Sequence, residues 1–117
     1  MTDRPEDCIF CKIAAGELGT PFLAETEHVV AFDDISPQAP AHALVIPRRH
    51  VTSIRDLGED DAALLGEMIA VANQVAEAKG VDESGYRLVT NAGPDSGQEV
   101  HHLHVHVIGG RKLGPIA

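Results

Sequence analysis

Histidines alternate with apolar residues near the C-terminus of this 117-residue chain, over His102-Leu103-His104-Val105-His106-Val107-Ile108. A side-chain period of two is the period of a β-strand. The alternation predicts a strand whose apolar side chains face a core, while the three histidines lie in a row on the opposite face. Because imidazoles titrate near neutral pH, bind metals and hold anions, the row indicates chemistry rather than scaffolding.

Length and composition predict one domain with an aliphatic core. Domains typically hold about 100–150 residues, which suits a single domain over residues 1–117. Residues 1–7 are expected to form a flexible N-terminal segment. Hydrophobic residues make up 44% of the chain but aromatic residues only 3%, so the core must be built from Ile, Leu, Val and Ala. Self-association would help to cover such a thin core.

The charge of the chain argues against nucleic acid as a partner. The formal net charge is −9, whereas proteins that grip a phosphate backbone usually need a clustered basic face. A locally positive pocket can still bind a small anion. No stretch approaches the roughly 18 apolar residues of a membrane span, and the polar start is no signal peptide. We therefore expect no membrane association and a cytoplasmic location.

Apolar spacing and turn residues predict short strands and two helices. A short helix is expected over 8–15 and a long one over 60–79, each ended by a glycine. The apolar arc of the long helix is wider than one core-facing stripe needs, so its second side either meets a partner subunit or is buried within the domain. Strands are predicted over residues 22–25, 28–32, 42–46, 86–91 and 102–108. Short strands connected mostly as hairpins favour an α+β fold with an antiparallel sheet.

Three interpretations of the histidine row compete. His104 acts as a nucleophile or base beside orienting imidazoles, or the three histidines bind a catalytic zinc, or they have no chemical role. Same-face residues on a strand are about 6.6–7 Å apart, so three histidines in line converge poorly on one ion. The row suits an extended anion better, which favours nucleophilic catalysis. Asn91 and the glycine-rich loop before the row would supply donors for a phosphate.

Several segments resemble the histidine triad (HIT) superfamily, and within it the Hint branch. The signature His-φ-His-φ-His-φ-φ, where φ is apolar, matches residues 102–108. Further similar segments are residues 32–40 and 42–47, Gly97-Gln98, and Gly109-Gly110-Arg111. The resemblance implies the HIT fold, an antiparallel sheet of about five strands with one long and one short helix, assembled as a homodimer.

The resemblance also implies a hydrolase that cleaves the P–N bond of AMP or GMP phosphoramidates. The middle histidine, His104, would attack the α-phosphorus and form a nucleotidyl-histidine that water then hydrolyses. By position His106 would touch the phosphate and the leaving group, and His102 and His42 would orient the nucleophile. Asp34 would accept the ribose hydroxyls. The other implied substrate-binding residues are Asn91, Gly97, Gln98, Glu99 and Val100 near the phosphate, and Phe10, Ile13, Phe32, Ile35 and Leu44 around the base.

Elementary chemistry agrees with this assignment. A neutral imidazole is a good nucleophile, and a covalent intermediate splits one hard displacement into two easier ones. The departing amine must be protonated, either by His106 or before it arrives. Glu99 stands where animal Hint proteins place a serine, and the tail over 113–117 lacks their tryptophan. The alternatives are a dinucleoside polyphosphate hydrolase of the same superfamily and a nucleotide-binding regulatory protein with incidental catalysis.

Cys8 and Cys11 share one face of the predicted short helix. Three interpretations of this pair are open: two buried thiols, a redox pair, or half of a zinc site. The redox pair is disfavoured because no thioredoxin-like βαβ pattern surrounds the two cysteines. HIT proteins with such a CxxC resemble the zinc case and complete the site at positions that match His50 and His102. The resemblance therefore implies a closed, structural Cys₂His₂ zinc site that the chemistry does not need.

Overall fold

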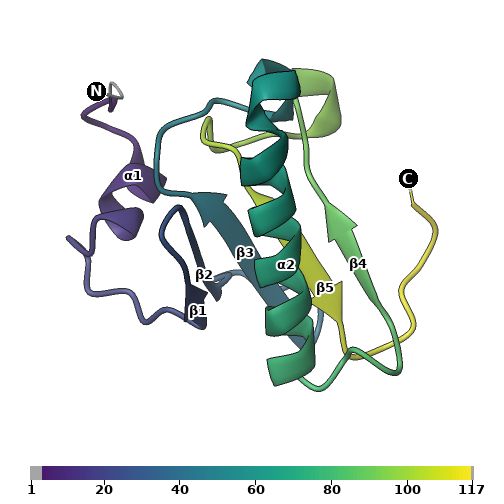
Figure 1. Cartoon of the computed structure of the whole chain (residues 1–117). Helices are drawn as coiled ribbons and strands as arrows, with labels where there is room; N and C mark the ends of the chain where they lie inside the picture. The colour runs from purple at the N-terminus through teal and green to yellow at the C-terminus, as the bar shows by residue number, and fades with distance from the viewer. Residues whose placement is uncertain (1–3, 117) are drawn as a thin grey trace.

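Five strands pair antiparallel in the order β1-β2-β3-β5-β4, in a computed structural model that describes residues 4–116 (Figure 1). The strands are β1 (Ala24–Glu25), β2 (Val29–Asp33), β3 (Ala41–Pro47), β4 (Tyr86–Val89) and β5 (Val105–Gly109). The helices are α1 (Ile9–Ala14) and α2 (Ala62–Ala78), with single 3-10 turns η1 (Ile54–Asp56), η2 (Glu59–Asp61) and η3 (Pro94–Ser96). The predicted α+β fold with an antiparallel sheet is confirmed.

The central strands are buried on both faces because alternate residues serve two separate cores. In β3, Ala43 and Val45 pack against α2, while Leu44 and Ile46 pack against α1. Leu103, Val105 and Val107 join the α2 core, as the alternation predicts. The even-numbered side chains of β3 and β5 consequently share the α1 face of the sheet.

Helix α2 lies across one face of the sheet (Figure 1). Its buried stripe follows the i, i+3, i+4, i+7 spacing of a core-facing helix, and consists of Met68, Val71, Ala72, Val75 and Ala76. The second apolar side is not fully covered within the domain, because Ile69 remains 38% exposed. Within residues 4–116, no helix is both long and apolar enough to cross a membrane.

The histidine strand is shorter than predicted, because β5 begins at Val105 rather than at His102. Val45 pairs with Val105, so the same register would place Leu103 opposite Pro47. Proline has no N–H to donate, and the ladder ends there. The Leu103 N–H donates instead to Val51 O at 2.6 Å. Residues 101–104 therefore lead into the strand outside the ladder, with a bend at residues 101–102. Strand β1 is likewise shorter than the predicted 22–25, and β4 ends two residues before Asn91.

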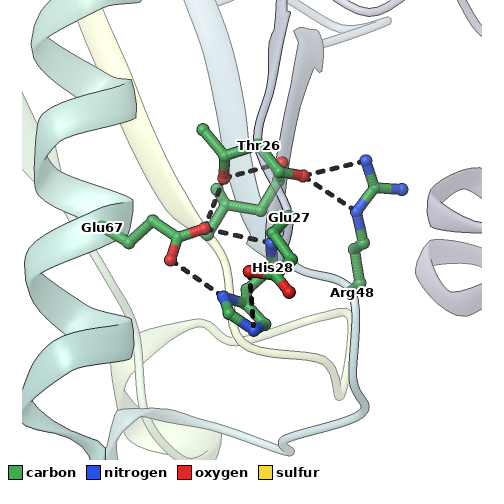
Figure 2. Close-up of polar contacts among 6 residues, drawn as sticks. Thr26, Glu27, His28, Arg48 and Glu67 are labelled. Atoms are coloured by element: carbon green, nitrogen blue, oxygen red, sulfur yellow. Dashed lines mark hydrogen bonds and ion pairs between the residues drawn. The ribbon is translucent and has the colours of Figure 1, made fainter.

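Glu67 of α2 fixes the turn between β1 and β2 (Figure 2). Its carboxylate accepts hydrogen bonds from the Thr26 hydroxyl, from the His28 N–H at 3.0 Å and from His28 Nδ1 at 3.0 Å. Arg48 holds the same turn by donating to Thr26 O. The Thr26 and His28 hydrogen bonds lower the pKa of Glu67 to about 2, and the pKa of His28 is raised by its bond to Glu67.

Glu67→Gln is expected to lower the melting temperature near pH 6, because an ionised acceptor is replaced by a neutral one. The pKa of Glu67 is depressed from 4.5 to about 2, so its contribution is full above pH 4.5 and is lost as the pH falls toward 2. Thermal unfolding at several pH values tests this, with Glu77→Gln on the same helix as the matched control. A difference between Glu67→Gln and the parent that persists unchanged at pH 2 would contradict it.

The N-terminal segment is tied to the body of the protein at Arg4, which forms a two-pronged ion pair with Glu17 at 2.6 and 2.8 Å. The prediction of a flexible segment over 1–7 falls partly on residues 1–3, which lie outside the described residues. For residues 4–7 it stays a prediction.

Candidate active site

A cavity of about 520 Å³ opens on the α1 face of the sheet. Small-molecule sites typically measure about 300–1,000 Å³, so the volume suits a nucleotide-sized ligand. Ten of the eleven predicted substrate-binding residues line it: Phe10, Ile13, Phe32, Asp34, Ile35, Leu44, Asn91, Gly97, Glu99 and Val100. The predicted catalytic residues His42, His104 and His106 line it as well.

Gln98 and His102 were expected in the site, yet neither side chain lines the cavity. Gln98 braces the preceding loop instead: its Nε2 donates to Thr52 O at 2.8 Å, and its Oε1 accepts from the Gly93 N–H at 3.0 Å. The His102 ring is fully buried and turns toward Cys8 and Cys11. The three histidines therefore do not form one line of imidazoles, because the chain bends at residues 101–102, before the strand begins.

The sheet register brings His42 and His106 together. Leu44 pairs with His106 and His42 pairs with Ile108, so the two histidines are diagonal neighbours on one face. His42 Nε2 lies 2.9 Å from His106 Nδ1. The side chain of His42 therefore contacts His106, and its predicted role in orienting the nucleophile stays a prediction.

The hydrogen bonds of His42 determine where its proton and that of His106 lie. The Gln38 N–H donates to His42 Nδ1 at 2.9 Å, so a neutral His42 carries its proton on Nε2. That proton is donated to His106 Nδ1, and a neutral His106 then carries its own proton on Nε2. His106 therefore presents an N–H donor through its remaining nitrogen.

His104 has the opposite protonation pattern. A carbonyl oxygen only accepts, so the 2.7 Å contact of His104 Nδ1 with His102 O places the proton on Nδ1. The Nε2 atom keeps its lone pair. Thr90 donates to His104 O at 2.8 Å, and the Phe10 ring meets the imidazole edge-on with ring centroids 5.2 Å apart. His104 thus presents the lone pair of Nε2, while its ring is held through Nδ1 and contacts Phe10.

Two of the triad histidines do not titrate near neutral pH. Burial, and then the neighbouring His104 and His42, lower the pKa of His106 to about 4, although Asp34 opposes this. Burial lowers the pKa of His102 to about 4 too. In the ligand-free protein His106 is consequently a neutral hydrogen-bond donor at pH 7 rather than a proton donor to the leaving group.

The depressed pKa of His106 predicts acid sensitivity of the fold. Between pH 6.5, its ordinary pKa, and about pH 4, the unfolded chain binds a proton at His106 that the folded chain does not. Stability is therefore lost as the pH falls through this window. His106→Asn should lose less of its melting temperature than the parent between pH 7 and pH 4.5. His101→Asn, at an exposed histidine, is the control. If the melting temperatures of the parent and of His106→Asn fall in parallel with pH, the depressed pKa of His106 is refuted.

Cys8, Cys11, His50 and His102 form a second constellation, called here the Cys/His cluster, whose four ligand atoms lie within 4.8 Å of one another. His102 Nδ1 lies 3.3 Å from Cys8 Sγ, and His50 Nδ1 lies 3.4 Å from Cys11 Sγ. A tetrahedral zinc with its usual bond lengths separates its ligands by about 3.3–3.8 Å. Two thiols and two imidazoles at this spacing fit zinc.

The surroundings of the cluster also suit a metal. His102 Nε2 donates to Pro47 O at 2.9 Å, which leaves a lone pair on Nδ1, the nitrogen that faces the cysteines. The Cys11 N–H donates to Cys8 Sγ at 3.3 Å. Burial and the neighbouring Cys8 raise the pKa of Cys11 to about 12, so a cation is what would hold this thiol as a thiolate.

Asp34, His42 and His106 also place ligand atoms within 4.8 Å of one another. His42 already accepts from Gln38 through Nδ1 and donates through Nε2, so it has no free lone pair for a cation. Asp34 Oδ1 accepts from the Ser36 N–H at 2.8 Å, and Asp34 Oδ2 lies 3.4 Å from His42 Nε2. His42 and His106 of this group are joined by a hydrogen bond, and without a lone pair on His42 the group lacks one of the three ligands that a metal would need.

A family model described as the HIT domain matches residues 15–113. The chain belongs to the HIT family. The sequence-based expectation of this family is therefore confirmed, and the matched residues include the whole sheet, α2 and all three triad histidines.

Relatives of this HIT protein match it along nearly its full length. The purine nucleoside phosphoramidase of Escherichia coli (strain K12) is 44% identical over 111 residues, covering 95% of this chain and 93% of the relative. A HIT family hydrolase from Clostridium thermocellum superposes with a TM-score of 0.91 at 45% identity, covering 96% of this chain and 97% of that one. A histidine triad protein from Clostridium difficile gives a TM-score of 0.92 at 41% identity, covering 98% and 100%.

Five residues of the HIT cavity were not anticipated: Ile9, Thr20, Asp33, Ser36 and Gln38. Ile9 could have been found, because it shares the predicted helix with Phe10 and Ile13. Gln38 acts through its backbone N–H, which no side-chain pattern reveals. Thr20 reaches the cavity only through the path of the loop after α1, for which the sequence carries no signal.

Proposed function

We propose that this HIT protein hydrolyses the P–N bond of AMP or GMP phosphoramidates through a covalent nucleotidyl-His104 intermediate. The observation that carries the proposal is the opposite protonation of two imidazoles at one cavity, a free Nε2 on His104 and an Nε2–H on His106. The named hydrolase and phosphoramidase relatives bear out the broader prediction that the chain is a HIT-type hydrolase.

The reaction proceeds in two displacements at phosphorus. His104 Nε2 donates its electron pair to the α-phosphorus, and the P–N bond breaks as the amine departs with its bonding pair and a proton. Because His106 is neutral, that proton comes with the substrate amine, and the His106 N–H stabilises negative charge on a phosphoryl oxygen. Water then attacks phosphorus and loses a proton to the solvent, the P–N bond to His104 breaks with its electron pair returning to Nε2, and the nucleoside monophosphate is released.

The cavity offers a place for each part of the nucleotide. Phe10, Phe32 and Leu44 are buried apolar residues that would face the base, with Ile13 and Ile35 beside them. Asp34 would accept hydrogen bonds from the ribose hydroxyls through the carboxylate lone pairs that the Ser36 N–H does not use. The phosphate is proposed to bind where Asn91, Gly97, Glu99 and Val100 line the cavity.

Incubation of the purified protein with adenosine and guanosine phosphoramidates tests the proposed reaction. We expect release of ammonia and the nucleoside monophosphate, with one oxygen-18 incorporated per product when the reaction is run in labelled water. Release of amine without nucleotide, or no release at all with either base, would overturn the proposal. The ratio of the two kcat/KM values decides between adenine and guanine.

The Cys/His cluster is proposed to hold one structural zinc ion. Elemental analysis of protein purified without chelators should give about one zinc per chain, and Cys8→Ser should lose the metal together with thermal stability, because structural zinc binding contributes to folding. Val75→Ala, which alters a buried residue in the α2 core rather than in the core that holds Cys8 and Cys11, is the control for metal content. A metal-free protein with the same melting temperature as its zinc-supplemented form would favour two buried thiols.

A homodimer is proposed from two uncovered elements. Strand β4 is an edge of the sheet with four half-buried residues, and Ile69 on α2 is exposed. Sedimentation of the full chain measures the oligomeric state directly.

A cytoplasmic location and the absence of nucleic acid or membrane partners stay predictions. The rival functions are a polyphosphate hydrolase and a nucleotide-binding regulator.

A further inference from the structure

The Cys/His cluster and the proposed nucleophile share one residue. The His102 ring belongs to the cluster, with its Nδ1 3.3 Å from Cys8 Sγ, while the His102 backbone carbonyl accepts the Nδ1–H of His104 at 2.7 Å. We propose that the cluster positions the nucleophile, with His102 as the positioning residue between them. This inference rests on the proposed role of His104 and goes beyond a zinc site that merely stabilises the fold.

The His102 carbonyl needs such an anchor because it lies outside the sheet ladder. Residues 101–104 precede β5, and His101 is exposed to solvent. Within the described chain, the backbone here is held by the Leu103 N–H bond to Val51 O and by the Thr90 bond to His104 O. The His102 ring adds one bond to Pro47 O and its contacts in the cluster.

Loss of the carbonyl as an acceptor would change the chemistry of His104 itself. A neutral imidazole released from this hydrogen bond distributes its proton between Nδ1 and Nε2. The form with the proton on Nε2 has no lone pair on the nitrogen that attacks phosphorus. The position of a backbone carbonyl therefore determines the fraction of His104 that can react.

Helix α1 provides a second link between the cluster and the cavity. Cys8 caps the helix and Cys11 lies within it, and between them Phe10 contacts His104 edge-on and lines the cavity. A helix of six residues is not stable alone, so its place depends on its anchors. Loosening the cluster should therefore weaken nucleotide binding as well as turnover.

The experiment compares full-length variants at temperatures well below their melting points. His50→Asn removes a cluster ligand that does not touch His104, and Cys11→Ser removes another. The matched control is Val75→Ala, which empties part of the α2 core on the other face of the sheet. Four quantities are measured with and without added Zn²⁺: zinc content, the Kd for AMP, kcat and KM for adenosine phosphoramidate, and the His104 tautomer by nitrogen-15 NMR.

We expect both cluster variants, and the zinc-depleted parent, to lose about 10–100-fold in kcat, as other residues that orient reacting groups do. Their His104 signals should change from one tautomer to a mixture, and Zn²⁺ should restore the parent. Val75→Ala should lose melting temperature while its kcat and tautomer stay unchanged.

An unchanged kcat and a single His104 tautomer in zinc-depleted parent and in His50→Asn would overturn the inference and leave a purely structural cluster. If Cys11→Ser does not fold, His50→Asn and the Zn²⁺ titration of the parent decide. If the parent itself releases no amine, the proposed function fails. The His104 tautomer and the Kd for AMP then still test whether the Cys/His cluster positions His104.

Discussion

His104→Ala is expected to lower kcat for adenosine phosphoramidate by about four orders of magnitude or more, because the covalent pathway disappears with its nucleophile. AMP binding should remain close to that of the parent, since the apolar slot and Asp34 are untouched. Single-turnover kinetics and calorimetric titration with AMP measure the two effects separately. A regulatory protein with incidental catalysis would show the same binding but little turnover to lose.

The matched control for this variant is His101→Ala, the neighbouring histidine that is exposed and outside the cavity. It should leave kcat unchanged. Turnover of His104→Ala within about tenfold of the parent would remove His104 from the role of nucleophile, because loss of a covalent catalyst costs far more than that.

AMP–amine conjugates are expected to react with a kcat/KM about tenfold or more above that of diadenosine triphosphate, equivalent to ~1.4 kcal/mol in the barrier. The charged residues lining the cavity, among residues 4–116, are Asp33, Asp34 and Glu99 apart from the histidines, and none is Lys or Arg. A polyphosphate brings further negative charges to this surface and to a chain of formal charge −9.

Glu99→Gln tests the electrostatic origin of this preference. The substitution removes one negative charge from the cavity wall. It should raise kcat/KM for the polyphosphate and so reduce the ratio of kcat/KM for the AMP–amine to kcat/KM for the polyphosphate. Added salt should reduce the same ratio in the parent protein, because salt screens exposed charges. A parent that prefers diadenosine triphosphate would belong with the polyphosphate hydrolases of the superfamily.

Several features could be predicted from the sequence because they depend on neighbours along the chain. The buried stripe of α2 and the alternation of Leu103, Val105 and Val107 follow from helical and strand periodicity. The motif spacing placed His104 and His106 at one cavity, and the CxxC spacing at the start of a short helix placed two thiols within 4.8 Å of each other.

The position of each proton and the separate path of His102 were decided by the tertiary structure alone. The His42 and His106 tautomers depend on a backbone N–H of Gln38, and the end of the histidine strand depends on Pro47 lying opposite Leu103 in the register. These partners come from segments far apart in sequence, so no local pattern encodes their contact. The residue types that carry the chemistry could be identified from the sequence. The direction in which each imidazole faces is set only when the sheet brings distant backbone atoms within hydrogen-bonding distance.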